Sequence, residues 1–175
     1  MRLVKVRLRL AMIAIGVFAL IFAAWVLLKD LHEALLVDYR PGGPVELRTQ
    51  FYQELARGSA ALRQGDFDEA EARYTTALRL AEKSSSTADQ TSWYDVPAAL
   101  IGLADSLAGR ARLDEAEPLY TRALAIREDG YGPDDPSVAE ILEHYAASLD
   151  RAGRAPDRDR ITTRSRAIRA KAVRK

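Results

Sequence analysis

Two stretches of this sequence are near copies of one another: residues 65–78 read GDFDEAEARYTTAL, and residues 111–124 read ARLDEAEPLYTRAL. Three positions recur at an offset of 46 residues, in the order small, aromatic, small: Ala70, Tyr74 and Ala77 return as Ala116, Tyr120 and Ala123. The spacing i, i+4, i+7 places each trio on one face of an α-helix. Such a face suits a helix packed closely on a neighbour, with tyrosine filling the gap between two alanine contacts.

Each copy reads as the second helix of a helical hairpin. A small residue, Gly58 or Ala104, lies 12 positions before the first alanine of each trio, inside an earlier apolar-periodic run. Short turns at residues 64–66 and 109–111 separate the paired runs, as an antiparallel connection requires. A third unit follows at an offset of 42 residues, but Arg158, Thr162 and Ser165 replace its small–aromatic–small trio. A polar final helix is expected where no further repeat covers it.

This pattern resembles the tetratricopeptide repeat family, whose helix–turn–helix units carry these small and aromatic positions. The resemblance implies an all-α domain over residues 51–172, with about three hairpins at 51–84, 97–130 and 136–172, stacked in a short right-handed solenoid. It also implies a concave surface that binds protein segments. The second unit, followed by Gly-Pro-Asp-Asp-Pro at 132–136, is similar to the longer, kinesin-light-chain type of repeat. There we expect Asp135 to cap a helix that begins at Pro136.

The family's peptide-binding members clamp a carboxylate or a peptide backbone with Asn and Lys, but this chain contains no Asn. The usual clamp is therefore excluded. Residues 84–92 read as a flexible polar loop that leads to Trp93 and Tyr94. Two interpretations of this aromatic pair stay open, namely packing at the start of the next helix and an exposed binding patch.

A membrane anchor is predicted near the N-terminus. Residues 10–28 are 19 consecutive uncharged residues, and at about 1.5 Å per residue they match a bilayer core of roughly 30 Å. The run is longer than the apolar core of a cleavable signal, which favours an uncleaved transmembrane helix, continuing to about residue 39. Residues 40–50 then form a Pro/Gly joint and the start of the first repeat helix. Four basic residues in 1–9 predict a cytoplasmic tail, with the repeats on the extracytoplasmic side of an inner membrane.

The Ala- and Arg-rich composition favours a bacterial source, although mitochondrial outer-membrane receptors of similar layout keep their repeats in the cytosol. Along the predicted span, Gly16, Ala19 and Ala23 form a stripe of small residues. This stripe is either a seam for a partner helix or the ordinary small-residue content of a membrane helix.

Charge is divided unevenly along the chain, although the net charge is +1. Residues 29–150 hold 12 basic and 23 acidic side chains, whereas residues 151–175 hold 10 basic and 2 acidic ones. The anionic body favours a basic or apolar partner. The basic end reads as a capping helix or as a contact for acidic groups of a partner or of the chain itself. It has no aromatic residue for base stacking, so no nucleic-acid partner is expected.

No chemistry of catalysis is recognisable. The chain has no Cys and only two His, His32 and His144, neither within a partner motif. The acidic clusters at 66–71 and 114–117 lie where helices begin, and there they complement the helix dipole. We therefore expect no catalytic, cofactor or metal site and no small-molecule substrate. The predicted function is a membrane-anchored scaffold or assembly factor that binds protein partners beside the lipid bilayer. The alternative is a permanent accessory subunit of a membrane complex.

Overall fold

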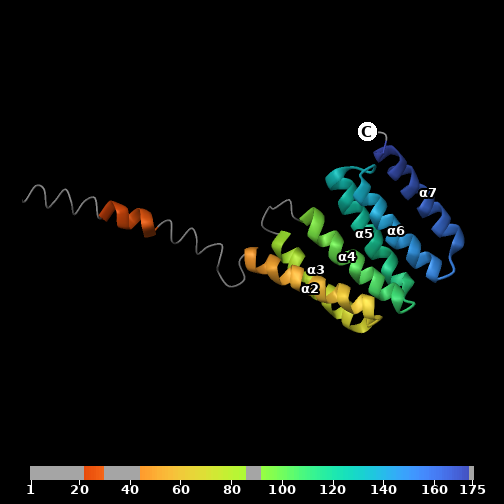
Figure 1. Cartoon of the computed structure of the whole chain (residues 1–175), viewed down its shortest axis with the longest axis horizontal. Helices are drawn as coiled ribbons and strands as arrows, with labels where there is room; N and C mark the ends of the chain where they lie inside the picture. The colour runs from red at the N-terminus through yellow and green to blue at the C-terminus, as the bar shows by residue number, and fades with distance from the viewer. Residues whose placement is uncertain (1–21, 30–43, 86–91, 174–175) are drawn as a thin grey trace, which may run out of the picture. The chain divides into compact units, whose positions relative to one another are not determined.

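A computed structural model describes residues 22–29, 44–85 and 92–173, and these residues form helices joined by short turns. The prediction of an all-α protein is confirmed. The main unit contains six helices (Figure 1): α2 (Pro44–Gln64), α3 (Phe67–Ser85), α4 (Ser92–Gly109), α5 (Leu113–Tyr131), α6 (Pro136–Arg151) and α7 (Ala155–Ala172).

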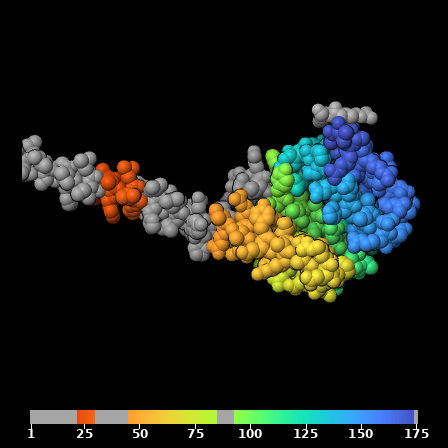
Figure 2. Space-filling view, viewed as in Figure 1, coloured from red at the N-terminus to blue at the C-terminus, as the bar shows by residue number. Residues whose placement is uncertain are grey.

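These helices form three hairpins, α2/α3, α4/α5 and α6/α7, stacked side by side as a solenoid (Figure 1). α3 packs on α4, α5 packs on α6, and α4 also contacts α6. The space-filling view places α2, in orange to yellow, and α7, in dark blue, on opposite sides of the stack (Figure 2). The expectation of about three hairpins matches this arrangement.

The core lies between the hairpins and includes every predicted repeat-packing residue. All eight are buried: Gly58, Ala70, Tyr74, Ala77, Ala104, Ala116, Tyr120 and Ala123. The alanines let neighbouring helices approach closely, and the tyrosines fill the remaining gaps. Larger apolar side chains, among them Phe51, Leu100 and Leu149, complete the same core.

The Tyr74 ring shows how closely the hairpins interlock. A Cβ atom added at Gly58 of α2 would lie 2.9 Å from the ring, and one added at Gly102 of α4 would lie 2.1 Å from it. No side chain fits at either place while the ring is there. Tyr74 therefore occupies a slot made by its own hairpin and the next one, and burial raises its pKa to about 12.

The three hairpin turns share one backbone conformation. Gly65, Ala111 and Gly153 lie at equivalent positions and have positive φ angles of 76°, 58° and 72°. The amide that follows each of them returns to a carbonyl five residues earlier, as in Arg112 N to Leu107 O at 2.9 Å. Ala111 thus adopts a conformation that favours glycine.

Two helix starts have identifiable causes. Asp135 caps α6, because its side chain accepts a hydrogen bond from the Ser137 amide at 2.8 Å and Pro136 occupies the first turn; this prediction is confirmed. α4 begins at Ser92, earlier than residue 97, the predicted start of that repeat. The Trp93 ring packs within 2.9 Å of where a Cβ of Gly130 on α5 would lie, which holds this extra turn in place.

Ion pairs join the basic α7 to the acidic helices before it. Only Ser165 and Ile168 are buried on this helix. Five pairs with N–O distances of 2.5 to 3.0 Å connect α7 and its preceding residue to α5, α6 and the α5–α6 loop: Arg154–Glu117, Arg158–Asp150, Arg164–Glu128, Arg169–Glu143 and Lys171–Asp134. The basic block of the sequence is therefore directed largely at the chain's own acidic block.

Residues 1–46 form a separate unit, of which residues 22–29 are helical. Phe22, Trp25, Leu27 and Leu28 are 57% to 70% exposed. Among the described residues, no helix combines the length and apolar character needed to cross a membrane. Most of the predicted span 10–28 lies outside the described residues, as do Gly16 and Ala19 of its small-residue stripe; Ala23 is helical and exposed.

Candidate functional site

A groove of about 630 Å³ crosses the first helices of the three hairpins. α2 provides six of its wall residues: Tyr52, Leu55, Ala56, Ser59, Leu62 and Arg63. Their spacing of one, three or four residues places them on one side of α2. At 1.5 Å per residue this wall is about 16 Å long. The groove is therefore long enough for several residues of a bound segment.

The floor and the other wall come from α4 and α6. These helices contribute eight residues: Ala98, Ile101, Gly102 and Asp105 from α4, and Ser137, Glu140, Ile141 and His144 from α6. Tyr74 and Arg127 reach the groove from the second helices, α3 and α5. The lining combines aliphatic side chains with charged ones, so it can bury apolar residues of a ligand and also orient polar ones.

Asp105 holds a hydrogen-bond network in this lining. One carboxylate oxygen accepts a hydrogen bond from the Tyr120 hydroxyl, and the other lies 2.8 Å from His144 Nδ1. The Tyr120 hydroxyl is also 2.8 Å from Ser148 Oγ. The network joins α4, α5 and α6. The hydrogen bond to Asp105 raises the pKa of His144, and burial is the main cause of the raised pKa of Tyr120.

Arg127 is the unusual member of the lining. Its side chain is buried, with 8% of its surface exposed. The guanidinium carbon lies 4.3 Å from the centre of the Tyr94 ring and 5.8 Å from that of Tyr131. Within the described part of the chain, its Nε and Nη1 atoms have no hydrogen-bond acceptor.

The aromatic pair that begins α4 divides between its two interpretations. Trp93 packs edge-on against Tyr131, with ring centres 6.0 Å apart, and is partly buried. Tyr94 is 55% exposed and covers Arg127. The packing interpretation therefore holds for Trp93, whereas Tyr94 forms part of the surface beside the groove.

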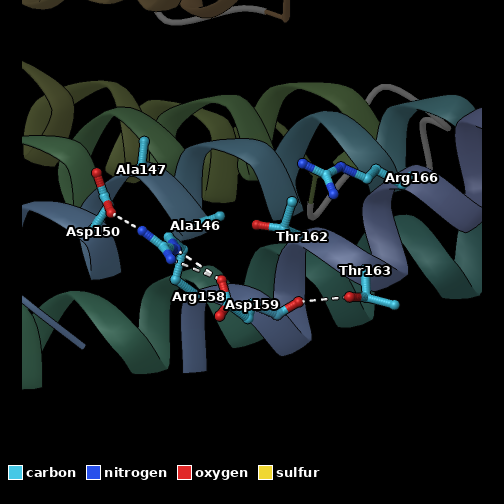
Figure 3. A pocket seen from close by; sticks show the side chains of 8 residues that line it. All are labelled: Ala146, Ala147, Asp150, Arg158, Asp159, Thr162, Thr163 and Arg166. Carbon is cyan, nitrogen blue, oxygen red and sulfur yellow. Dashed lines mark hydrogen bonds and ion pairs between the residues drawn. The ribbon is translucent and has the colours of Figure 1, made fainter. Parts of the chain in front are cut away.

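A second cavity, of about 510 Å³, lies between α6 and α7. Figure 3 shows Thr162 between the Arg158–Asp150 ion pair and Arg166. Thr162 stands at the repeat position of Tyr120, so the cavity lies where the preceding units carry a tyrosine ring. Its lining is polar, which agrees with the sequence prediction of a polar final helix.

Three groove residues were not among the predicted site residues. Gly102 and Asp105 belong to α4, and their roles depend on which side chains of α3, α5 and α6 meet them. Arg127 had a detectable signal, because it continues the face of Ala116, Tyr120 and Ala123 at i+11. A charged residue on an otherwise apolar packing face is that signal.

Among the described residues, no group of three or more His, Asp or Glu side chains is arranged to hold a metal ion. His144 has a partner, Asp105, that lies 39 residues away in sequence and on another helix. His32 lies outside the described residues. The pair joins two helices of the solenoid.

Comparison with known protein families identifies one match. The tetratricopeptide repeat family model matches residues 55–133, which cover most of α2 and all of α3, α4 and α5. No curated protein matches the sequence. The matched residues include each of the eight predicted repeat-packing positions, and the solenoid of hairpins is the fold expected of this family.

Proposed function

We propose that this chain is a membrane-anchored interaction module whose groove holds a segment of a partner protein. Tetratricopeptide repeats bind protein partners, and the family match supports that general role. The observation that carries the proposal is the groove itself, which combines Leu55, Ile101 and Ile141 with charged residues along one side of the solenoid.

Site-specific photocrosslinking in intact cells tests this function. A photoreactive residue at Ser59 or Glu140, which line the groove, is expected to give a discrete adduct with a partner protein. The same residue at Thr75 or Thr121, which are exposed and outside the groove lining, serves as the matched control. Equal adducts from all four positions, or adducts from the controls alone, would contradict a groove-binding role.

The proposed anchor is the apolar run at residues 10–28. The exposed Phe22, Trp25, Leu27 and Leu28 of the helical stretch 22–29 support it, since large apolar side chains at a surface call for an apolar environment. The basic residues of 1–9 support a cytoplasmic N-terminus and extracytoplasmic repeats. A partner of the groove would then lie beside the membrane, on its outer face.

Reporter fusions at Lys175 test this topology. A phosphatase that is active only outside the cytoplasm should be active, and a cytoplasm-dependent fluorescent protein should be dark. The reverse pair of results would place the repeats in the cytosol. Deletion of residues 1–43 is expected to release the protein from the membrane fraction.

The alternative role is that of a permanent accessory subunit. Its support is the run of Gly16, Ala19 and Ala23 in the proposed membrane helix, which permits close helix contact. Purification in mild detergent separates the two roles. A fixed partner ratio that persists in high salt supports the subunit, whereas variable or substoichiometric partners support the scaffold.

The second unit is proposed to be of the longer, kinesin-light-chain-like type. α5 extends over 19 residues to Tyr131, and the next helix begins at Pro136 behind the Asp135 cap. These features support the subtype, because its second helix is long and a Gly-Pro-Asp-Asp-Pro segment follows it here at 132–136.

A further inference from the structure

Arg127 occupies a position at which the preceding repeat carries alanine. At the offset of 46 residues that relates the two repeats, Arg127 corresponds to Ala81. Both side chains are buried, with 2% of Ala81 and 8% of Arg127 exposed. The fold of the repeat therefore needs only a small apolar residue here. The arginine introduces a charge that packing does not require.

A buried guanidinium without an acceptor is unfavourable. Native proteins pair their buried charges, since the desolvation of an ion is offset only by an opposite charge or by hydrogen bonds. In the described part of the chain, Nε and Nη1 of Arg127 are both buried and lack an acceptor. The faces of Tyr94 and Tyr131 attract the cation, but a cation–π contact contributes only about 0.5 to 2 kcal/mol.

The acids beside this arginine have other partners. Asp95 accepts a hydrogen bond from the Tyr52 hydroxyl at 3.1 Å. Asp105 is shared by Tyr120 and His144. The carboxylates of α4 that could otherwise neutralise the arginine are thus engaged. The unsatisfied donors lie in the lining of the groove, where a bound segment would be placed.

We propose that Arg127 binds the carboxylate of an Asp or Glu side chain carried by the partner segment. The inference rests on the proposed groove-binding function and specifies its ligand. Two of the three guanidinium nitrogens are unsatisfied, and a carboxylate offers two acceptor oxygens. The rest of the segment is apolar or basic, in keeping with the aliphatic lining and with the anionic body of the repeats.

The acidic group belongs to a side chain within the segment and not to a chain end. Arg127 lies below the groove surface, and an Asp or Glu carboxylate reaches down on its own carbon stem while the backbone passes above. The covering rings, Tyr94 at 55% exposure and Tyr131 at 38%, lie at the surface and can rotate to admit it. The groove is also open along its length, which favours a segment that continues at both ends.

A randomised peptide library tests the proposal, because it offers every side chain at every position and requires no named partner. The full-length chain in mild detergent is used to select from displayed peptides whose 12 random residues are flanked by constant sequence on both sides. No random residue is then a chain end. We expect one position to be enriched in Asp and Glu over Asn and Gln by at least about tenfold, as a charge-assisted hydrogen bond would give.

Arg127→Met is the test variant, because methionine fills the same space without the charge. It should bind peptides with this enrichment abolished. Arg122→Met is the matched control on the same helix, since Arg122 is exposed and pairs with Glu82 at 2.6 Å. The control should keep the wild-type preference. An acidic preference that persists in Arg127→Met, or that disappears equally in Arg122→Met, overturns the proposal.

The other outcomes separate the ligand of Arg127 from the function of the groove. Selected peptides with no acidic position overturn the role of Arg127 and leave the groove function in place. Failure to select any peptide overturns both. A selection that succeeds only with a free peptide C-terminus assigns the site to a chain end and overturns the side-chain proposal.

A direct measurement covers the case in which Arg127→Met does not fold. The Nε–H signal of Arg127 is followed by NMR in the wild-type chain, while a selected acidic peptide or its Gln counterpart is added. The acidic peptide should shift this signal, and the Gln peptide should leave it nearly unchanged. The same shift with both peptides, or no shift with either, contradicts contact between the carboxylate and Arg127.

Discussion

At each hairpin turn one residue adopts a left-handed backbone, and in the middle hairpin that residue is an alanine. Ala111 has a φ angle of 58°, where Gly65 and Gly153 take the equivalent positions. A left-handed conformation costs a residue with a side chain about 1 to 2 kcal/mol. Ala111→Gly should therefore stabilise the protein by about 1 kcal/mol, despite the greater chain entropy of glycine.

Urea unfolding followed by circular dichroism measures this effect. Gly65→Ala is the matched reverse change, because an added Cβ at Gly65 meets no atom within 4 Å and only the backbone is affected. It should destabilise the protein by about the same amount. Two changes of the same sign would show that backbone strain at this turn is not what decides the effect.

The slot that holds Tyr74 makes a second prediction. Gly102→Ala would gain helix propensity of less than about 1 kcal/mol, but its Cβ would lie 2.1 Å from the ring. Overpacking of this kind costs about 1 to 3 kcal/mol, so we expect net destabilisation. Adding Tyr74→Leu removes the clash. The double variant should lose less stability than the sum of the single variants, and strict additivity in thermal unfolding would contradict the slot.

The pair of His144 and Asp105 predicts a dependence on pH. The hydrogen bond to Asp105, with help from the nearby Glu140 and Glu143, raises the pKa of His144 above its usual value, although burial opposes the shift. A raised pKa in the folded state stabilises the fold below about pH 6.5, and this contribution is lost as the pH rises through the folded pKa.

His144→Gln tests this sign. The difference in unfolding free energy between wild type and variant should be larger at about pH 6 than at about pH 9. The comparison is made between variants because other groups also titrate in this range. An equal difference at both pH values would mean that protonated His144 makes no stabilising contact. The side chain is 45% exposed, so the effect should be small.

At the scale of helices, α7 differs from the rest in what holds it. Only two of its residues are buried, and five ion pairs attach it and the residue before it to earlier parts of the chain. Salt at about 1 M reduces the screening length to roughly 3 Å. We therefore expect backbone amides of α7 to exchange with deuterium faster in high salt. The amides of α4, a helix with an apolar core face, provide the reference. Equal salt effects on both helices would show that α7 is held by packing.

The repeat trios made the helical pairs predictable, because their spacing is local to one helix. Ala70, Tyr74 and Ala77 need only 8 residues of sequence to be recognised. The contacts of Gly102 and Asp105 were not predictable in the same way, since each depends on side chains from other helices. Arg127 lies between these cases. Its position on the packing face was visible, but its missing acceptor was not.

For the whole molecule, the compact unit Leu47–Lys175 is separate from the residues before it. Its core is built from side chains of its own helices. Deletion of residues 1–43 should therefore leave the thermal unfolding midpoint of the helical unit unchanged. Circular dichroism of the shortened chain measures this. A substantial fall in the midpoint, or a loss of helix content, would show that the N-terminal residues contribute to the fold.

The cavity between α6 and α7 has a use in protein engineering. Thr162 stands where the earlier repeats place a tyrosine, and the Arg158–Asp150 pair lines the space beside it. A designer who wished to add a hairpin after α7 would need Thr162→Tyr, a glycine on the incoming helix to receive the ring, and an apolar replacement for the ion pair. With these changes the array could be lengthened one hairpin at a time, and each added hairpin would extend the surface available for new ligands.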